Sequence, residues 1–273
     1  MAMFPESVSE RTGLAGGPEG LRQAMGLLRR RLIALLAHLP EQEWEHASRC
    51  VGWSIHDVAR HVRDVALIHT SRLAGRRRPF GDEPFDPRSS PSRWLQHTAG
   101  EPASQTMDDL GRLAREEDDL FGSRIEEPPD RLWTSPLGRK VHWSVFSLHL
   151  YWDAWLHEAD IAVALGIPIH RTDLDLQMAI LYALLSAAAP TARTGEYLDA
   201  SIALIDSPSD CYLISHVGDD VTINARPGSP GSLQADASEL IDSLAGRGRD
   251  LADILAGPRD VVKQLGLLRA LGT

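Results

Sequence analysis

Histidine and aspartate recur at one-turn spacing within a segment whose apolar pattern is helical. His149, Asp153 and His157 are each four residues apart, and Asp160 follows three residues later. Residues three or four apart lie on one face of a helix, so these side chains are expected to form a row. Imidazole and carboxylate groups one turn apart can bind a single divalent cation. The row therefore predicts part of a metal site.

A second segment supplies a partner for this row. His61 lies among apolar positions in another predicted helix, which begins after Ser54, a residue type that favours helix N-caps. The interior of a helical bundle is a place where side chains from facing helices meet at one ion. The two segments together predict a metal site built from His61 and the row that contains His149, Asp153 and His157. A hydrogen-bonded core histidine and a purely structural Asp153–His157 pair form the alternative interpretation.

Helical periodicity predicts the elements that must position these residues. Apolar residues recur at three- and four-residue steps in four stretches, separated by segments that contain proline or glycine. The expected helices run from Leu21 to before Pro40, and over about 55–73, 103–125 and 143–165, with a Pro-rich loop at 74–92. Four helices with polar outer faces predict an antiparallel bundle.

The character of the chain changes after these helices. All seven tryptophans precede residue 156. A helix is expected at about 172–188, ending by Pro190, then strands at 200–205, 211–215 and 220–224, and helices near 236–245 and 258–270. The predicted fold class is α+β, a four-helix bundle followed by a small C-terminal α/β domain. The expected division is a flexible lead-in at 1–17, the bundle at 18–168 and the C-terminal domain at 169–273.

The composition excludes several classes of protein. The formal net charge of −10 argues against nucleic-acid binding, which needs clustered Lys and Arg. No run approaches the roughly 18 apolar residues that a membrane span requires. The N-terminus lacks a cationic start followed by an apolar core, so no signal peptide is expected. We therefore expect a cytoplasmic protein in which Cys50 and Cys211 are thiols.

Two segments resemble motifs of a known family. Residues 50–62, Cys-Val-Gly-Trp-Ser-Ile-His-Asp-Val-Ala-Arg-His-Val, resemble the segment C-P-G-W-[ST]-x-x-[DE]-V-x-x-H-[LV] of the mycothiol-dependent maleylpyruvate isomerases. Residues 153–166 are similar to the second motif of that family, E-x-x-x-H-x-x-D-[IL]-x-x-A-L-G. The resemblance covers most of 20–166 and implies a DinB-like metal-binding four-helix bundle. A weaker match near 235–247 is similar to the C-terminal domain of the family.

The resemblance implies roles for individual residues. His61 and His157 match the two histidine ligands of the family, whereas Asp153 stands where the family usually has glutamate. The shorter aspartate binds the metal directly only if its helix approaches more closely, and a bridging water is the alternative. His149 would then be either an additional ligand or a supporting residue that packs beside the site. Arg247, or alternatively Arg249, is the candidate for binding an anionic substrate, against a plain surface role at a helix end.

The same resemblance implies the cofactors and the reaction class. Zinc is the expected metal, although a site of mixed nitrogen and oxygen ligands also suits nickel, iron or manganese. The family implies a low-molecular-weight thiol, typically mycothiol, as the second cofactor. The expected function is an isomerase or S-transferase acting on a small electrophilic substrate.

Several alternatives stay open at this point. One is a metal-dependent hydrolase or lyase-type enzyme that acts without a thiol, and another is a non-catalytic metal-binding relative. Cys50 is expected to pack at the helix entry rather than to act as a nucleophile. The sequence is compatible with a monomer or a homodimer.

Overall fold

The computed structural model describes residues 17–81, 85–86, 89–125, 132–134, 140–194, 199–206, 211–217, 220–226 and 230–265. The lead-in predicted at 1–17 thus lies outside the described residues except for Gly17, which begins a helix. The chain divides into two compact units. Leu21–Glu127 and His149–Arg171 form one, named the bundle unit, and the rest forms the other, named the sheet unit. The predicted domain boundary after residue 168 stays a prediction.

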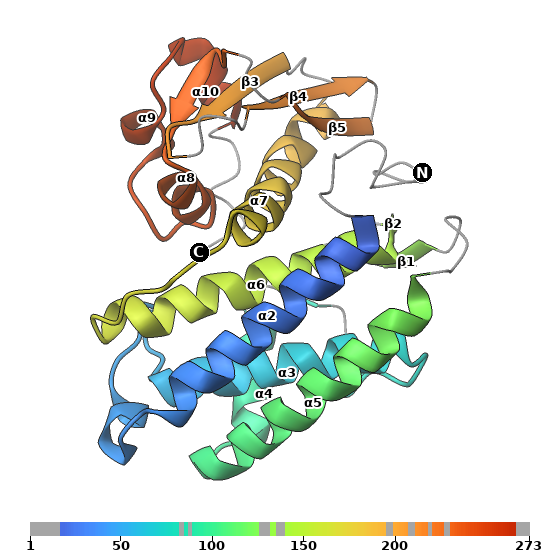
Figure 1. Cartoon of the computed structure of the whole chain (residues 1–273), viewed down its shortest axis with the longest axis vertical. Helices are drawn as coiled ribbons and strands as arrows, with labels where there is room; N and C mark the ends of the chain where they lie inside the picture. The colour runs from blue at the N-terminus through green and yellow to red at the C-terminus, as the bar shows by residue number, and fades with distance from the viewer. Residues whose placement is uncertain are drawn as a thin grey trace. The chain divides into compact units, whose positions relative to one another are not determined.

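Four long helices lie side by side and build the bundle (Figure 1). They are α2 (Gly17–Ala37), α3 (Ile55–Leu73), α5 (Ala103–Arg124) and α6 (Trp143–Ala164). Two short helices accompany them, η1 (Glu41–Glu45) and α4 (Ser90–His97). The four predicted helices are found, and the predicted α+β fold class is confirmed.

Helix α3 begins at a capping box formed by Ser54 and Asp57. The side chain of Ser54 accepts a hydrogen bond from the backbone nitrogen of Asp57 at 3.1 Å, and the Asp57 carboxylate accepts one from the Ser54 nitrogen at 2.9 Å. This capping box satisfies two backbone donors that the helix leaves unpaired at its first turn. Val58 and Val62 are fully buried, and His61 lies on the same inward side with 5% exposure.

Helix α6 is buried along most of its length, so its polar side chains need partners inside the protein. Glu158, which is 2% exposed, accepts hydrogen bonds from Arg31 Nε at 2.7 Å and Nη2 at 2.9 Å, and this pair links α6 to α2. The guanidinium of Arg171 lies 3.2 Å from the centre of the Trp155 ring. Such a cation–π contact, formed by the residue that closes the bundle unit, stabilises the end of the segment after α6.

A charged cluster also lies in the core of the bundle unit. Glu117 of α5 accepts hydrogen bonds from Arg29 of α2, from Nε at 2.9 Å and from Nη2 at 3.2 Å. His69 of α3 lies 2.5 Å from the same carboxylate through Nδ1. All three side chains are at most 2% exposed. This buried triad (Arg29, Glu117 and His69) therefore ties three of the four helices together.

The sheet unit contains a four-stranded sheet in the order β5-β4-β3-β6. Its strands are β3 (Asp199–Leu204), β4 (Cys211–Val217), β5 (Asp220–Ala225) and β6 (Leu233–Ala235). Only the β3–β6 pair is parallel, and the other two pairs are antiparallel. Helix α7 (Asp173–Thr194) packs on β4 and β5 and contacts α8 (Ala237–Leu244). Two further helices follow, α9 (Leu251–Ile254) and α10 (Arg259–Leu265).

Local predictions were wrong or incomplete in several places. Helix α4 begins within the predicted loop at 74–92. A hairpin of β1 (Leu132–Thr134) and β2 (Lys140–His142) and the short strand β6 had no sequence prediction. Helix α7 continues through Pro190 rather than ending there. Proline removes one helical hydrogen bond, and strands of three residues carry too little alternation to detect.

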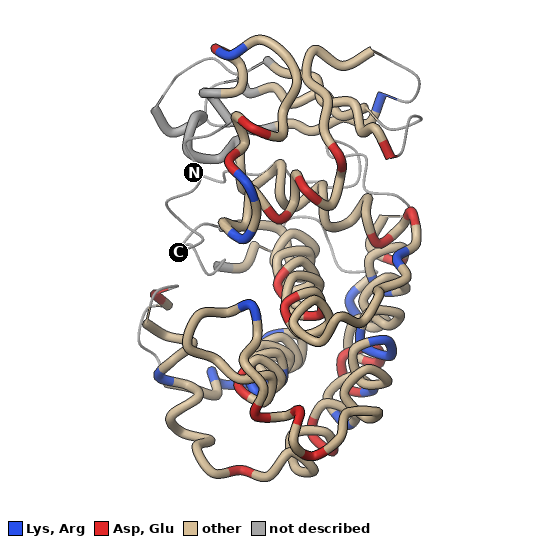
Figure 2. Tube along the Cα trace, turned by 90° about the vertical axis from the view of Figure 1, so that its left-hand side faces the viewer, with Lys and Arg blue, Asp and Glu red and all other residues tan. Residues whose placement is uncertain are grey.

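The bundle helices carry charges of both signs. Figure 2 shows Asp and Glu interspersed with Lys and Arg along these helices rather than a stripe of one sign. In the described part of the chain, no helix combines the length and the apolar character needed to cross a membrane.

Candidate metal centre

The three predicted metal ligands come together inside the bundle unit. His61 of α3 and Asp153 and His157 of α6 each offer a donor atom, and these atoms lie within 4.8 Å of one another. Asp153 Oδ2 is 3.6 Å from His61 Nε2, and Asp153 Oδ1 is 3.7 Å from His157 Nε2. Neighbouring donors in a tetrahedral zinc site with bonds of about 2.0–2.2 Å lie about 3.4 Å apart. The spacing is therefore longer than that of hydrogen bonds and close to that of ligands around one ion.

The chemistry of these donors fits a cation. Asp153 Oδ2 is buried and has no hydrogen-bond partner among the described residues. An ionised oxygen in such a position is unfavourable unless something compensates its charge. Both histidines are 5% exposed, whereas the Asp153 side chain is 21% exposed. A cation held between the three side chains would compensate the carboxylate and would be reached from the side of Asp153.

The electrostatics around Asp153 favour its ionised form. Burial by itself raises the pKa of this carboxyl group, but the imidazoles of His157 and His61 outweigh it and hold the pKa below its ordinary value. Metal binding requires a deprotonated carboxylate. The ionised form of Asp153 meets this requirement.

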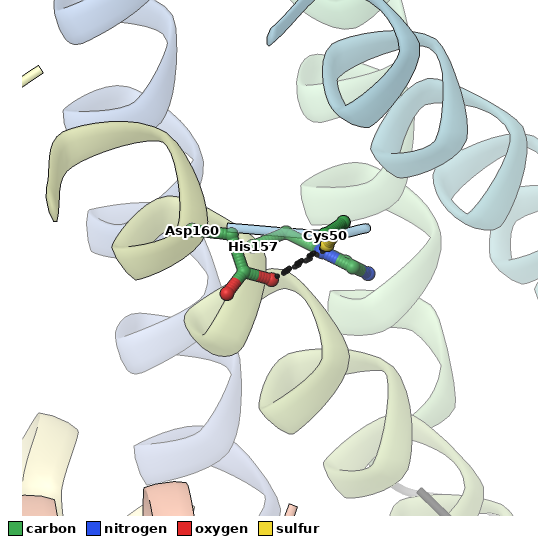
Figure 3. A group of neighbouring side chains, drawn as sticks. All are labelled: Cys50, His157 and Asp160. Carbon is green, nitrogen blue, oxygen red and sulfur yellow. Dashed lines mark hydrogen bonds and ion pairs between the residues drawn. The ribbon is translucent and has the colours of Figure 1, made fainter. Parts of the chain in front are cut away.

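A second carboxylate orients His157. The Nδ1 atom of His157 donates a hydrogen bond to Asp160 Oδ2 at 2.9 Å (Figure 3). The other oxygen of Asp160 accepts from Arg49 Nε at 3.1 Å, and Asp160 is fully buried. A proton on Nδ1 leaves the lone pair of Nε2 free, and Nε2 is the atom that faces Asp153. Carboxylates that accept from the far nitrogen of a histidine commonly support metal binding in this way.

Cys50 joins the same network. Its thiol donates to Asp160 Oδ2 at 3.1 Å and lies 3.7 Å from His157 Nδ1 (Figure 3). Cys50, His157 and Asp160 thus form a second group of closely spaced donor atoms. In that group His157 Nδ1 and both oxygens of Asp160 already have partners, whereas Asp153 Oδ2 has none. The group of His61, Asp153 and His157 is therefore the better candidate for the metal.

An aromatic side chain covers both histidines. The ring of Trp53 lies 5.2 Å from that of His61 and stacks at 6.3 Å on that of His157. The two imidazoles pack edge to face, with their centres 4.8 Å apart. Trp53 comes from the turn that precedes α3, where Gly52 adopts a positive φ of 81°. An aromatic ring beside the ligands lowers the local dielectric, which strengthens electrostatic interactions there.

Other sequence candidates lie outside this group of donors. His149, one turn before Asp153, packs its ring 6.3 Å from that of Trp152, and burial lowers its pKa. Arg247 follows α8 in the sheet unit, and its Nη1 donates to the carbonyl of Ala245 at 3.3 Å. Arg249 Nη2 donates to the carbonyl of Asp253 at 3.0 Å. The proposed roles of His149 and Arg247 stay predictions.

The sequence interpretation missed three contributors to the site. Asp160 was placed in the row of side chains without a role, and Arg49 was not considered. Cys50 was interpreted as a packing residue, but its sulfur donates to Asp160. The three-residue step from His157 to Asp160 was a usable signal for their hydrogen bond. The contribution of the turn before α3 depends on tertiary packing, which spacing does not reveal.

Comparisons with known proteins point to one family. The family model described as the mycothiol maleylpyruvate isomerase N-terminal domain matches residues 25–162. A crystal structure of the mycothiol-dependent maleylpyruvate isomerase is similar, with a TM-score of 0.61 at 14% identity, over 88% of this chain and 92% of that chain. A histidine-to-alanine mutant of that enzyme gives a TM-score of 0.57 at 14% identity, with the same coverage of 88% and 92%. No curated protein matches the chain.

The two kinds of likeness carry different weight. At 14% identity, the similarity to the solved structures shows a common fold and no more. The family model spans half of the chain and includes His61, Asp153, His157 and Asp160. The chain therefore belongs to the mycothiol maleylpyruvate isomerase family.

Proposed function

We propose that this chain is a metal-dependent enzyme that uses a low-molecular-weight thiol, such as mycothiol, on a small electrophilic substrate. The observation that carries the proposal is the convergence of His61 Nε2, His157 Nε2 and the Asp153 carboxylate, with donor distances of 3.6 and 3.7 Å. Two imidazoles and one carboxylate leave a further coordination position on zinc. Zinc is the proposed metal, and nickel, iron and manganese suit the same donors.

A divalent cation at this position would favour the thiolate form of a bound thiol over the neutral form, which provides a nucleophile at neutral pH. The residues of the chain prepare the site for that chemistry. Asp160 keeps the Nε2 lone pair of His157 available by accepting from Nδ1. Trp53 shields both imidazoles, while the partly exposed Asp153 marks the side from which ligands approach. The compatible reactions are a cis–trans isomerisation through reversible addition and a transfer in which the carbon–sulfur bond is kept.

One feature supports a second candidate, a metal-dependent hydrolase or lyase-type enzyme without a thiol. Asp153 is shorter than the glutamate of the family motif, and its side chain is 21% exposed. A shorter carboxylate leaves more room for water beside a metal, and metal-activated water is the nucleophile of many hydrolases. A non-catalytic metal-binding relative is the third outcome that the experiment must separate.

Thermal unfolding with added ligands separates these candidates. We expect zinc to raise the melting temperature, and mycothiol to raise it further only when zinc is present. Turnover of maleylpyruvate, the substrate named for the structural relatives, is expected to require both. His157→Ala is the matched control and should lose both responses.

Each alternative predicts a different result in the same experiment. Metal-dependent turnover of ester or amide substrates without thiol would support the hydrolase instead. Zinc stabilisation with no thiol response and no turnover would support the non-catalytic relative. An identical metal content in wild type, His61→Ala and His157→Ala would contradict the proposed ligands.

We also propose that Arg247 binds the anionic part of the substrate. A guanidinium recognises a carboxylate through two parallel hydrogen bonds, which lysine does not reproduce. Arg247→Lys should therefore raise KM for an anionic substrate at least tenfold and leave zinc affinity unchanged. Arg249→Lys is the companion variant, because Arg249, whose side chain is 62% exposed and pairs with Glu239, is the alternative candidate. An unchanged KM in Arg247→Lys would mean that Arg247 is a surface residue at the end of a helix and does not bind substrate.

A further inference from the structure

We infer that Asp64 is the positioning residue of His61, as Asp160 is of His157, so that two matching Arg–Asp–His arms hold the metal ligands. The inference rests on the proposed metal centre and assigns a task to a buried carboxylate that the centre does not otherwise use. The two histidines both face Asp153 through Nε2, and they differ in what surrounds Nδ1.

The arm of His157 is complete in the structure. Arg49 Nε donates to Asp160 Oδ1 at 3.1 Å, and His157 Nδ1 donates to Asp160 Oδ2 at 2.9 Å. Asp160 lies three residues after His157 on the same helix and is fully buried. The chain of contacts thus runs from guanidinium to carboxylate to imidazole and ends with Nε2 facing Asp153.

The arm of His61 repeats the same parts on α3. Asp64 lies three residues after His61 and is 1% exposed. Arg63 Nε donates to Asp64 Oδ1 at 2.7 Å, as Arg49 Nε does to Asp160 Oδ1. His61 Nε2 faces Asp153 at 3.6 Å, as His157 Nε2 does at 3.7 Å. Arginine, carboxylate and histidine therefore occur with the same atoms in the same order.

Only the last hydrogen bond of this second arm is missing. His61 Nδ1 and Asp64 Oδ2 are both buried, and each lacks a hydrogen-bond partner among the described residues. A buried ring nitrogen and a buried carboxylate oxygen without hydrogen-bond partners are each unfavourable, by roughly 1–3 kcal/mol. The i,i+3 spacing allows the bond, because His157 and Asp160 form it with the same spacing on α6. A cation on Nε2 would place the proton of His61 on Nδ1, where Asp64 can accept it.

Arg63 offers the competing partner for Asp64. Its Nη2 is also buried without a hydrogen-bond partner in the described part of the chain, so a small rotation could pair it with Oδ2. Its Nη1 already donates to Glu101 at 3.0 Å. If Arg63 took both oxygens of Asp64, the Nδ1 proton of His61 would stay without an acceptor. The experiment must therefore observe the His61 ring itself.

Two measurements on the full chain test the inference. In the zinc-loaded wild type, long-range ¹H–¹⁵N NMR of the assigned histidine rings should show a protonated, exchange-protected Nδ1 on both His61 and His157. Chelator competition should show about 10- to 100-fold weaker zinc binding in Asp64→Asn and in Asp160→Asn. Asp118→Asn is the matched control, because Asp118 is 47% exposed and pairs with Arg22, and its zinc affinity should not change.

The possible failures are distinguishable. A wild type that binds no zinc would overturn the metal centre and this inference together. Zinc binding with a rapidly exchanging or unprotonated His61 Nδ1 would overturn the inference alone, as would an Asp64→Asn variant with wild-type affinity. If Asp64→Asn does not fold, the ring spectrum of the wild type still decides.

Discussion

Two clusters in the bundle unit combine histidine with a carboxylate but differ in how far the protein pairs that carboxylate. The buried triad joins Arg29, Glu117 and His69, and the proposed metal centre joins Asp153 with two histidines. In the triad, Arg29 reaches both oxygens of Glu117, at 2.9 and 3.2 Å, and His69 lies 2.5 Å from one of them. In the metal centre, Asp153 Oδ2 has no hydrogen-bond partner among the described residues.

Burial and residue type therefore do not by themselves identify a functional site. Both clusters combine imidazole with carboxylate, and all their side chains are buried except that of Asp153, which is 21% exposed. What separates them is whether the carboxylate oxygens are already satisfied by the protein. A satisfied carboxylate ties helices together, whereas one that lacks a hydrogen-bond partner and faces two imidazoles can accept a cation.

The largest expected effect is the loss of stability when the triad is broken. Glu117→Gln leaves the buried Arg29 charge without an ionised partner, which should lower the free energy of unfolding by about 3–5 kcal/mol. Urea denaturation measures this change. Asp118→Asn removes the neighbouring, half-exposed carboxylate and should change stability by less than about 1 kcal/mol. If both variants lowered the free energy of unfolding equally, Glu117 would not be more important for stability than its exposed neighbour.

The triad should also make the free energy of unfolding depend on pH in the acidic range. Burial would raise the pKa of Glu117, but Arg29 and His69 outweigh it and lower the pKa from 4.5 to about 2. Stability from a lowered carboxyl pKa is fully present above the unfolded value and is lost as pH falls toward the folded value. About 3 kcal/mol should therefore be lost between about pH 4.5 and pH 2. The difference in the free energy of unfolding between wild type and Glu117→Gln should decrease over this pH range, as urea denaturation at each pH would show.

At the proposed metal centre, a substitution should affect zinc binding strongly and the stability of the metal-free protein only weakly. Asp153→Asn should remove stabilisation by zinc, about 2.7 kcal/mol at a zinc concentration one hundred times the wild-type Kd, and change the metal-free protein far less. Asp153→Glu, which restores the residue of the family motif, should keep zinc binding and serves as the matched control. Calorimetry with and without zinc measures both. Strong destabilisation of metal-free Asp153→Asn would make this cluster a second structural network.

The smallest expected effect concerns Cys50. Its thiol donates to Asp160 and has no direct place among the three proposed ligands. Removing one hydrogen bond of about 1 kcal/mol from the network should weaken zinc binding only about fivefold in Cys50→Ala. Chelator competition measures the change. A loss as large as that in His157→Ala would mean that Cys50 is itself a ligand.

Much of the bundle was predictable because its signals are local. Ser54 and the apolar steps after it predicted α3, which runs from Ile55 to Leu73. The four-residue steps predicted that Asp153 and His157 share a face of α6, and their donor atoms lie together. Short elements such as α4 and β6 were not predicted, because a few residues carry too little periodicity.

The rest of the site could not be predicted, because it depends on tertiary contacts. Arg49 and Cys50 reach Asp160 across about 110 residues of sequence. The fact that Asp64 and His61 both lack partners is visible only when every neighbouring atom is placed. Spacing identifies which side chains share a helix face, but it does not show which of their atoms are already paired.

The most direct test of the metal centre is X-ray absorption at the zinc edge of the loaded protein without added thiol. The expected ligands of the zinc are nitrogen and oxygen atoms at about 2.0–2.2 Å, including two imidazoles, and no sulfur. A sulfur atom at about 2.3 Å would place the metal at Cys50 and contradict the proposed ligands. A protein that takes up no metal would contradict the metal centre altogether.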